Sequence, residues 1–458
     1  MKSDKELREL VQSAVAATIK AGADQADAML EYSRVFTGRV RDGKPDLVKQ
    51  ATRNGIGIRA FVGGRTGFVS SSDLRPESLA MLTQRAVALA KIGEVDPHAG
   101  LPEIPINAAI PVVDLDIFDD ALAGLATEKK LAMARATEEA ARAFDKRVTK
   151  VDGATFSDTL TTITIANSAG RLDQYRATSA NIGTRAICDD KNGKQQSGGY
   201  GTNRRFLSEL ESPEKVGTEA AKAAVEMLGP VTLSTRKVPV LMHADIAAAW
   251  LGAMVGAFNG EQVFKKSSYL TEKMGQKIGS DLVTIVDDGV MKRGPVTAPF
   301  DGEGLPTRRN VLLDKGVVTT FLYDSYNARK AGTRSTGSAQ RGYDSTPGIG
   351  TRNLHVVNGA STISDMLKAY PALFYMRDQG AFGYTPTTGD YSYQAAGLWI
   401  ENGEVVHPVD GITVASNTLT MLAGIVKVGN DLNIQGGTNS PHLLIDEMTI
   451  SGEGEQAG

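Results

Sequence analysis

The stretch IGIRAFVGGRTG (residues 56–67) decides the fold of the first half of this chain, because a second copy, IGTRAICDDKNG (residues 182–193), follows 126 residues later. A strand–turn–strand pattern precedes each copy, and Asp42-Gly43 and Ala169-Gly170 supply residues that hairpin turns favour. After each copy, a Ser-rich or Gly-rich break leads into a helix whose start carries Ser, Pro and Glu. Two copies at so long a period indicate a duplication and not a solenoid. The alternative is two unrelated hairpins that share only Gly and Arg.

The duplicated units define an N-terminal α/β domain, residues 1–234, in which they occupy about 27–96 and 147–229. A Pro-rich, aperiodic stretch at 96–113 reads as a connector between them, and a further helix is predicted around 127–144.

The second half, residues 235–458, consists of short alternating segments split by glycines, many joined by Asp-Gly, Asn-Gly or Lys-Gly. These joints are typical of β-hairpins. We therefore predict an α+β fold, with the duplicated β-hairpin-plus-helix units followed by a largely antiparallel β domain, either a sandwich or barrel-like. Residues 327–353 have no periodicity, and a loop of that length in a compact domain is usually functional or mobile.

Composition excludes several classes of protein. The 458 residues are 41% hydrophobic and 22% charged, as in an ordinary globular protein, and the net charge of −3 gives no attraction to nucleic acid. The single cysteine, Cys188, excludes an intramolecular disulfide and a CxxC zinc site, and we interpret it as a small buried side chain. No unbroken apolar run is long enough for a signal peptide or a membrane span. We expect a cytoplasmic protein without a membrane or direct nucleic-acid partner.

The stretch PVLMHADIAAAWLG (residues 239–252) raises the question of a metal site. A short apolar strand, 240–242, ends at His243 and leads into an Ala-rich helix. Many zinc hydrolases place their first metal ligand at such a junction. None of the five histidines, however, belongs to an HExxH, HxxEH or HxH pair.

At His243 the chain resembles the TldD/PmbA family, also called the modulator of DNA gyrase family. The resemblance runs in order through residues 239–451, and the duplicated first half matches as well. It is carried by PVLMHADIAAAW, VFKKSSYL, DLVTIVDDG, APFDGEGLPTRRNVLLDKGVV, DSYNARKAGTRSTG, GLWIENGEVVHPVDGITVASN and LLIDEMTISG.

The resemblance implies two branches. In the TldD branch the junction reads HExxxH, and the chain is a zinc peptidase whose third ligand is a cysteine near the C-terminus. In the PmbA (TldE) branch the motif is lost, and the chain accompanies a TldD-type subunit. Overlaid on this sequence, HExxxH places its first histidine on His243, its glutamate on Ala244 and its second histidine on Ala248. Alanine can neither act as a general base nor bind a metal, so we expect no metal and no catalytic residue at this junction.

The resemblance therefore predicts a non-catalytic, TldE-like subunit of a zinc metallopeptidase complex that processes unfolded peptides, a pseudoenzyme that is inactive alone. Zinc is expected only on a TldD-type partner, in a heterodimer, and this chain carries no cofactor. A homodimer is the alternative assembly.

Five polar residues are candidates for a substrate groove. Asp301 and Glu303, in FDGEG, form a carboxylate pair of the kind that does acid–base work or binds a cation. Tyr326, Asn327 and Arg329 directly precede the long loop and could line a groove for an extended peptide. Fixing of turns is the competing interpretation for all five.

Three other hypotheses stay open. The chain could be a stand-alone metallopeptidase whose ligands come from His355, His407 and His442 with Asp301, Glu303 or Asp410, although no spacing supports this. It could bind DNA or gyrase, which the acidic balance and the absence of a basic stripe argue against. It could also be a homodimeric peptide-binding or scaffold protein.

Overall fold

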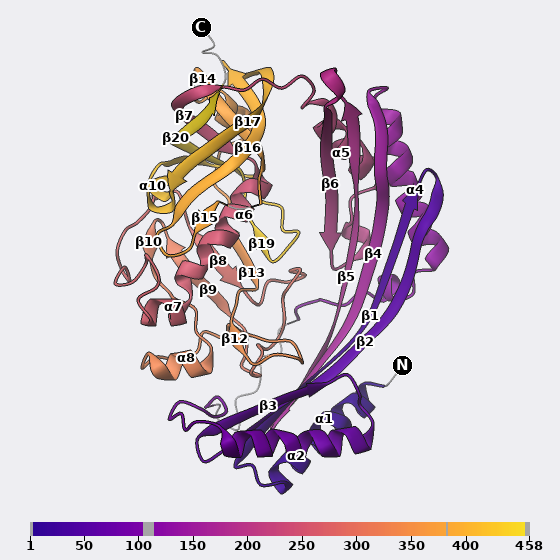
Figure 1. The fold of residues 1–458 in the computed structure, drawn as a ribbon, viewed down its shortest axis with the longest axis vertical. Helices are drawn as coiled ribbons and strands as arrows, with labels where there is room; N and C mark the ends of the chain where they lie inside the picture. The colour runs from indigo at the N-terminus through magenta and orange to yellow at the C-terminus, as the bar shows by residue number, and fades with distance from the viewer. Residues whose placement is uncertain (1–2, 104–113, 382, 454–458) are drawn as a thin grey trace.

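The computed structural model describes residues 3–103, 114–381 and 383–453 and shows an α+β protein, as predicted (Figure 1). Its first half is built on one antiparallel sheet of six strands in the order β3-β2-β1-β4-β5-β6. These strands are β1 (Gln25–Arg41), β2 (Lys44–Val62), β3 (Arg65–Ser71), β4 (Val148–Asn167), β5 (Leu172–Asp189) and β6 (Gln195–Arg204). The predicted duplication is confirmed, because each copy supplies three consecutive strands and the copies join where β1 pairs with β4.

The hairpin turns lie where the sequence places them. Asp42 and Gly43 both have positive φ, 51° and 72°, as a two-residue turn between twisted strands requires. In the second copy Gly170, with φ of 91°, allows the chain to reverse between β4 and β5.

Helices cover the face of the sheet that is turned away from the C-terminal half (Figure 1). The helical segments of this half are α1 (Asp4–Lys20), α2 (Pro76–Ile92), α3 (Asp120–Ala123), α4 (Thr127–Phe144), α5 (Pro213–Val225), η1 (Lys191–Gly193) and η2 (Leu207–Glu209). Because side chains alternate along a strand, Ala28, Leu30 and Phe36 of β1 pack under these helices, whereas Asp27 and Met29 face the C-terminal half. Of the connector predicted at 96–113, residues 104–113 lie outside the described residues.

The second half is largely antiparallel, as predicted, with two parallel strand pairs, β7–β14 and β13–β19. One sheet contains β7 (Ser234–Met242), β14 (Ala372–Gln379), β15 (Tyr384–Thr385), β16 (Asp390–Glu401), β17 (Glu404–Asn417), β18 (Ile425–Val428) and β20 (Leu443–Glu453). A second contains β8 (Ile285–Asp288), β9 (Arg309–Asp314), β10 (Val317–Val318), β13 (Asn353–Val356) and β19 (Thr438–Asn439). A small ribbon pairs β11 (Ala339–Gln340) with β12 (Gly348–Ile349).

Both larger sheets contribute to one core in a sandwich-like arrangement, together with the apolar helix that follows His243. The helical segments of this half are α6 (Ala244–Met254), η3 (Val255–Phe258), α7 (Gly260–Phe264), α8 (Ser325–Lys330), α9 (Ile363–Leu367) and α10 (Thr418–Ala423). Trp250 and Met254 of α6 are fully buried in that core. Within the described ranges, no helix is long and apolar enough to cross a membrane.

The aperiodic segment 327–353 joins the two halves. It begins within α8, carries the β11–β12 ribbon, and places Tyr343 across β2. A Cβ on Gly55 would lie 2.1 Å from the Tyr343 ring, and one on Gly57 would lie 2.0 Å from the Tyr343 carbonyl oxygen. The glycines of β2 therefore leave the space that this loop occupies.

Each half of the duplicated sheet also depends on a glycine beneath a helix. A Cβ on Gly67 of β3 would lie 2.1 Å from the carbonyl oxygen of Ala86 in α2. A Cβ on Gly198 of β6 would lie 2.3 Å from the backbone nitrogen of Ala224 in α5. Both clashes are with backbone, which cannot rotate away as a side chain does.

Gly198→Ala should therefore lower the free energy of unfolding by about 1–3 kcal/mol, the usual cost of overpacking. Gly256→Ala is the matched control, because Gly256 is exposed and a Cβ there meets nothing within 4 Å. Urea denaturation followed by circular dichroism would check this, and equal midpoints for the two variants would contradict the proposed close packing.

Candidate functional site

His243 lies at the strand–helix junction that the sequence indicates. β7 ends at Met242, and His243 is the N-cap of α6, with φ of −56° and ψ of 150°. Its Nδ1 accepts the backbone N–H of Asp245 at 3.2 Å, which satisfies one of the free N–H groups at the helix start. The Asp245 carboxylate is 3.5 Å from the same nitrogen. Two residues on a regular helix would point apart, but His243 has non-helical dihedrals and the two side chains meet.

Strand pairing brings two more rings to His243. β14 runs parallel to β7 and β20 runs antiparallel to it, so Tyr375 of β14 and His442, just before β20, reach the same junction. The ring centroids of His243 and His442 are 4.8 Å apart, and those of His243 and Tyr375 are 6.2 Å apart.

Both ring nitrogens of the buried His442 are engaged. Nδ1 is 2.5 Å from a carboxylate oxygen of Asp431, and Nε2 is 2.9 Å from the hydroxyl of Tyr375. Burial raises the pKa of Tyr375 to about 12, so its O–H stays protonated and donates to Nε2. Burial alone would raise the pKa of Asp431, but its bonds from His442 lower it, so the carboxylate accepts Nδ1–H. Both contacts are satisfied when the ring carries its proton on Nδ1.

The residues at this junction do not fit a catalytic zinc ion, which needs three protein ligands and an open position. The positions to which the resemblance assigns the general base and the second ligand are alanines, Ala244 and Ala248, and both ring nitrogens of His442 already have partners. Across the described part of the chain, no three His, Cys, Asp or Glu side chains are grouped so as to hold a metal ion. His355 and His407 each contact a backbone carbonyl, of Asn353 and Pro408.

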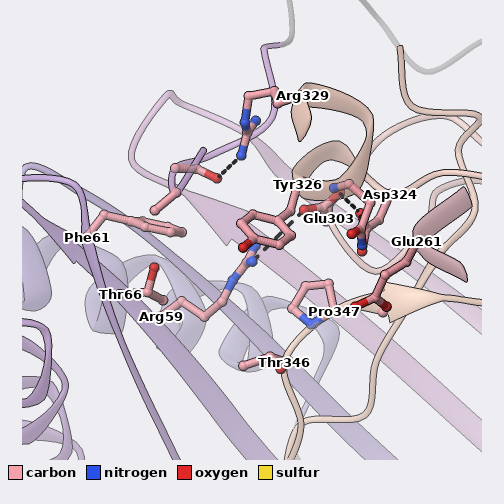
Figure 2. Close-up of a pocket in the computed structure, with 14 residues that line it drawn as sticks. Arg59, Phe61, Thr66, Glu261, Glu303, Asp324, Tyr326, Arg329, Thr346 and Pro347 are labelled. Carbon is pink, nitrogen blue, oxygen red and sulfur yellow. Dashed lines mark hydrogen bonds and ion pairs between the residues drawn. The ribbon is translucent and has the colours of Figure 1, made fainter. Parts of the chain in front are cut away.

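Four of the five predicted groove residues line one cavity of about 260 Å³ between the two halves, the polar pocket (Figure 2). The polar pocket is lined by Arg59, Phe61, Thr66, Ala99, Gly100, Glu261, Glu303, Asp324, Tyr326, Asn327, Arg329, Thr346, Pro347 and Gly348. Sequence reasoning identified Glu303, Tyr326, Asn327 and Arg329 but missed the N-terminal strands and the connector that complete the pocket.

Two polar side chains of α8, Tyr326 and Arg329, form hydrogen bonds within the pocket wall. Tyr326 donates to Asp96 at 2.6 Å, and this bond raises the pKa of Tyr326 and lowers that of Asp96. The Arg329 guanidinium donates to the carbonyl oxygens of His98 and Gly100 at 2.8 and 3.1 Å. These bonds hold the connector against α8. Tyr326 and Arg329 therefore have structural contacts of the kind that the turn-fixing interpretation expects, in addition to lining the pocket.

Asp301, the fifth candidate, lines a different cavity from the other four. Its carboxylate accepts backbone N–H bonds from Glu303, Leu305 and Ala339 at 2.9, 3.0 and 3.2 Å, which fixes the FDGEG turn. Burial, and then the nearby Glu303, raises the pKa of Asp301 to about 7. Asp301 lines a second cavity, on the other side of this turn.

A buried group of four charges, the interface charge cluster, joins the halves: Asp27, Arg59, Glu303 and Arg341. Arg59 donates Nε and Nη2 to Asp27, and Arg341 donates Nη1 to the same carboxylate at 3.1 Å. The Nη1 of Arg59 is 4.0 Å from Glu303. Although burial alone would raise the pKa of Asp27, the charges of Arg341 and Arg59 hold it below its usual value.

The duplication contained a signal for this cluster. Arg59 has its counterpart in Arg185, but the position equivalent to Asp27 is Gly153, 126 residues on. Arg185 is accordingly exposed, and it donates to Ser197 at 2.8 Å. The carboxylate that pairs with Arg59 is therefore present in the first copy and replaced by glycine at the equivalent position of the second.

Arg59→Gln should therefore lower the free energy of unfolding by about 3–5 kcal/mol, because it leaves Asp27 and Glu303 buried with less compensation. Arg185→Gln, at the equivalent exposed position, should change it by less than about 0.5 kcal/mol. Thermal and urea denaturation of both variants would measure the difference. Similar losses in both would contradict a special role for the first copy.

The pKa of His243 predicts a pH dependence of stability. Burial is the largest cause that lowers this pKa from 6.5 to about 3, and the electrostatic effects of His442 and Arg377 act in the same direction. Below pH 6.5 the unfolded chain binds a proton at His243 that the folded chain does not. The free energy of unfolding therefore falls as pH decreases from 6.5 toward 3, by at most about 1.4 kcal/mol per pH unit from this group.

His243→Asn keeps a side chain that can cap the helix but does not titrate in this range. As pH decreases from 6.5 to 4.5, the free energy of unfolding of this variant should therefore fall less steeply than that of the parent protein. Urea denaturation of both proteins across this range would test it. The same slope in the two proteins would show that His243 does not titrate as inferred.

Comparison with known proteins agrees with the fold. Residues 26–90, 120–228 and 235–452 match the models for PmbA/TldA metallopeptidase domain 1, central domain and C-terminal domain. Metalloprotease PmbA of Escherichia coli O157:H7 is 31% identical, over 97% of this chain and 97% of its own length.

Two solved structures share the fold. A putative modulator of DNA gyrase from Bacteroides thetaiotaomicron superposes with a TM-score of 0.91 at 24% identity and covers 99% of this chain and 100% of that one. TldE from Thermococcus kodakarensis superposes with a TM-score of 0.85 at 22% identity, covering 97% and 100%. The family models span well over half of the sequence, and the resemblance seen in its motifs is confirmed: the chain belongs to the PmbA/TldD metallopeptidase family.

Proposed function

We propose that this chain is a non-catalytic subunit of a zinc metallopeptidase assembly, in which a TldD-type partner carries the zinc and the general base. The observation that carries the proposal is the chemistry of the β7–α6 junction. One histidine stands there as a helix cap, with alanines at the two positions that the resemblance assigns to the base and the second ligand. The work of this subunit is to bind and admit unfolded peptides in the cytoplasm.

The space between the two halves supports a peptide-binding role. The polar pocket is bordered by strands, the connector and the β11–β12 ribbon, and it offers both carboxylates and guanidinium groups. An extended peptide presents amide groups and charged ends that match such a lining. Glu261 and Asp324 add carboxylates on the α7–α8 side, where they are drawn facing the pocket in Figure 2.

The test is the metal content and peptidase activity of the purified chain, alone and after co-expression with a TldD-type chain from the same genome. We expect near-zero zinc per chain and no cleavage alone, and one zinc with cleavage in the complex. His243→Asn within the complex is the control, and it should leave cleavage unchanged. Zinc near one per chain, with cleavage by the isolated protein that His243→Asn abolishes, would overturn the proposal. If the chain forms a homodimer and does not associate with the co-expressed TldD-type chain, the assignment of the partner is overturned.

A further inference from the structure

Arg341 carries two buried donors that nothing in the described part of the chain satisfies. Its side chain is only 1% exposed, and Nη1 donates to Asp27. Nε and Nη2 are buried and have no hydrogen-bond partner. A buried donor without a partner loses its hydration without compensation, and the loss is larger for a charged group, so such donors normally meet a ligand or ordered water.

The two unpaired donors occupy the same edge of the guanidinium plane. That edge presents two parallel N–H bonds, which fit the two oxygens of a carboxylate. Arg59 uses its Nε and Nη2 in this way on Asp27. The neighbouring Arg341 presents the same pair of atoms without an acceptor.

Arg341 lines the second cavity, of about 450 Å³, which we call the arginine cavity. Arg352 lines it as well, and its buried Nε also lacks a partner. The carboxylates in the wall are already engaged: Asp301 accepts three backbone N–H bonds, and Glu31 accepts the hydroxyl of Ser33. Among the described residues of the wall, the buried side-chain atoms without a partner are therefore guanidinium donors.

The rest of the wall is apolar. Met29, Ile163 and Phe300 form part of one buried cluster, with Tyr175 packed against it. A ligand suited to this cavity combines a carboxylate with an adjacent apolar group, and the volume lies within the range of small-ligand sites, about 300–1,000 Å³.

We propose that the arginine cavity binds a carboxylate of a peptide, gripped by the free edge of Arg341, with Arg352 as a second donor and an apolar side chain against Phe300 and Ile163. The carboxylate is a peptide's C-terminus or an acidic side chain. That the carboxylate belongs to a peptide rests on the proposed function; the preference for a carboxylate rests on the cavity alone.

Isothermal titration of the isolated full-length chain tests this. The probes are N-acetyl-Ala-Leu with a free carboxylate, its C-terminal amide, a doubly blocked peptide with an internal glutamate, and inorganic phosphate. We expect the free acid to bind at least tenfold more tightly than the amide. Binding of the glutamate peptide instead would keep the carboxylate site and assign its source to a side chain. Binding of phosphate alone, or of no probe, would overturn the proposal, and ordered water would then account for the free donors.

Arg341→Lys keeps the positive charge beside Asp27 but loses the paired donors, so it should weaken binding of the acid tenfold or more. Arg352→Gln should also weaken it and decides the matter if Arg341→Lys does not fold. The matched control is Arg185→Gln, on an exposed arginine outside both cavities, which should bind as the parent does. Unchanged affinity in both test variants would overturn the site.

The outcomes separate this inference from the proposed function. A chain that binds the acid although no assembly cleaves peptides would leave the cavity assignment standing without the peptidase role. An assembly that cleaves peptides while the isolated chain binds no carboxylate would do the reverse.

Discussion

The buried carboxylate of Asp27 is the contact on which the arrangement of the two halves depends. It receives Arg59 from the neighbouring strand and Arg341 from a loop 314 residues away in the sequence. Burial of a lone carboxylate is strongly unfavourable, and two guanidinium groups reverse that cost only when both stay in place. The loop that carries Arg341 must therefore dock on the sheet, and Gly55 and Gly57 leave room for it to do so. Both cavities lie beside this cluster: Arg59 lines one and Arg341 lines the other.

Duplication explains the shape of the sheet, and divergence between the copies explains its use. Each copy supplies three consecutive strands of the sheet and packs a glycine beneath one helix, Gly67 beneath α2 and Gly198 beneath α5. They differ at the position of Asp27, where the second copy has Gly153 and leaves Arg185 in solvent. The face of β1 that carries Asp27 contacts the second half, and its opposite face packs against helices.

The β7–α6 junction gives His243 a structural role. His243 keeps a structural task as the N-cap of α6, which does not require the base or the second ligand. Beside His243, Asp431, His442 and Tyr375 form a chain of hydrogen bonds, so both ring nitrogens of His442 already have partners. The depressed pKa of His243 is a consequence of this crowding, because burial and neighbouring positive charges both oppose its protonation.

The sequence by itself determined the features that depend on neighbours in the chain. These include the duplicated hairpins, the helix at Thr127–Phe144, the strand that ends at Met242, and the replacement of two motif positions by alanine. Turn chemistry and periodicity are local, so they can be read from short windows. Four of the five groove candidates also line one pocket, because three of them, Tyr326, Asn327 and Arg329, lie on the same short helix, α8.

Only the tertiary structure decided which distant groups meet. His442 reaches Tyr375 because β14, β7 and β20 are adjacent in one sheet, an order that the spacing of residues along the chain does not reveal. The same holds for Arg341, whose partner Asp27 lies far away in the sequence, near the N-terminus. It also holds for Asp301 and Glu303, which are two residues apart in one turn but line different cavities. Strand order and register are set by the packing of the whole core, and a charge is buried or exposed according to that packing.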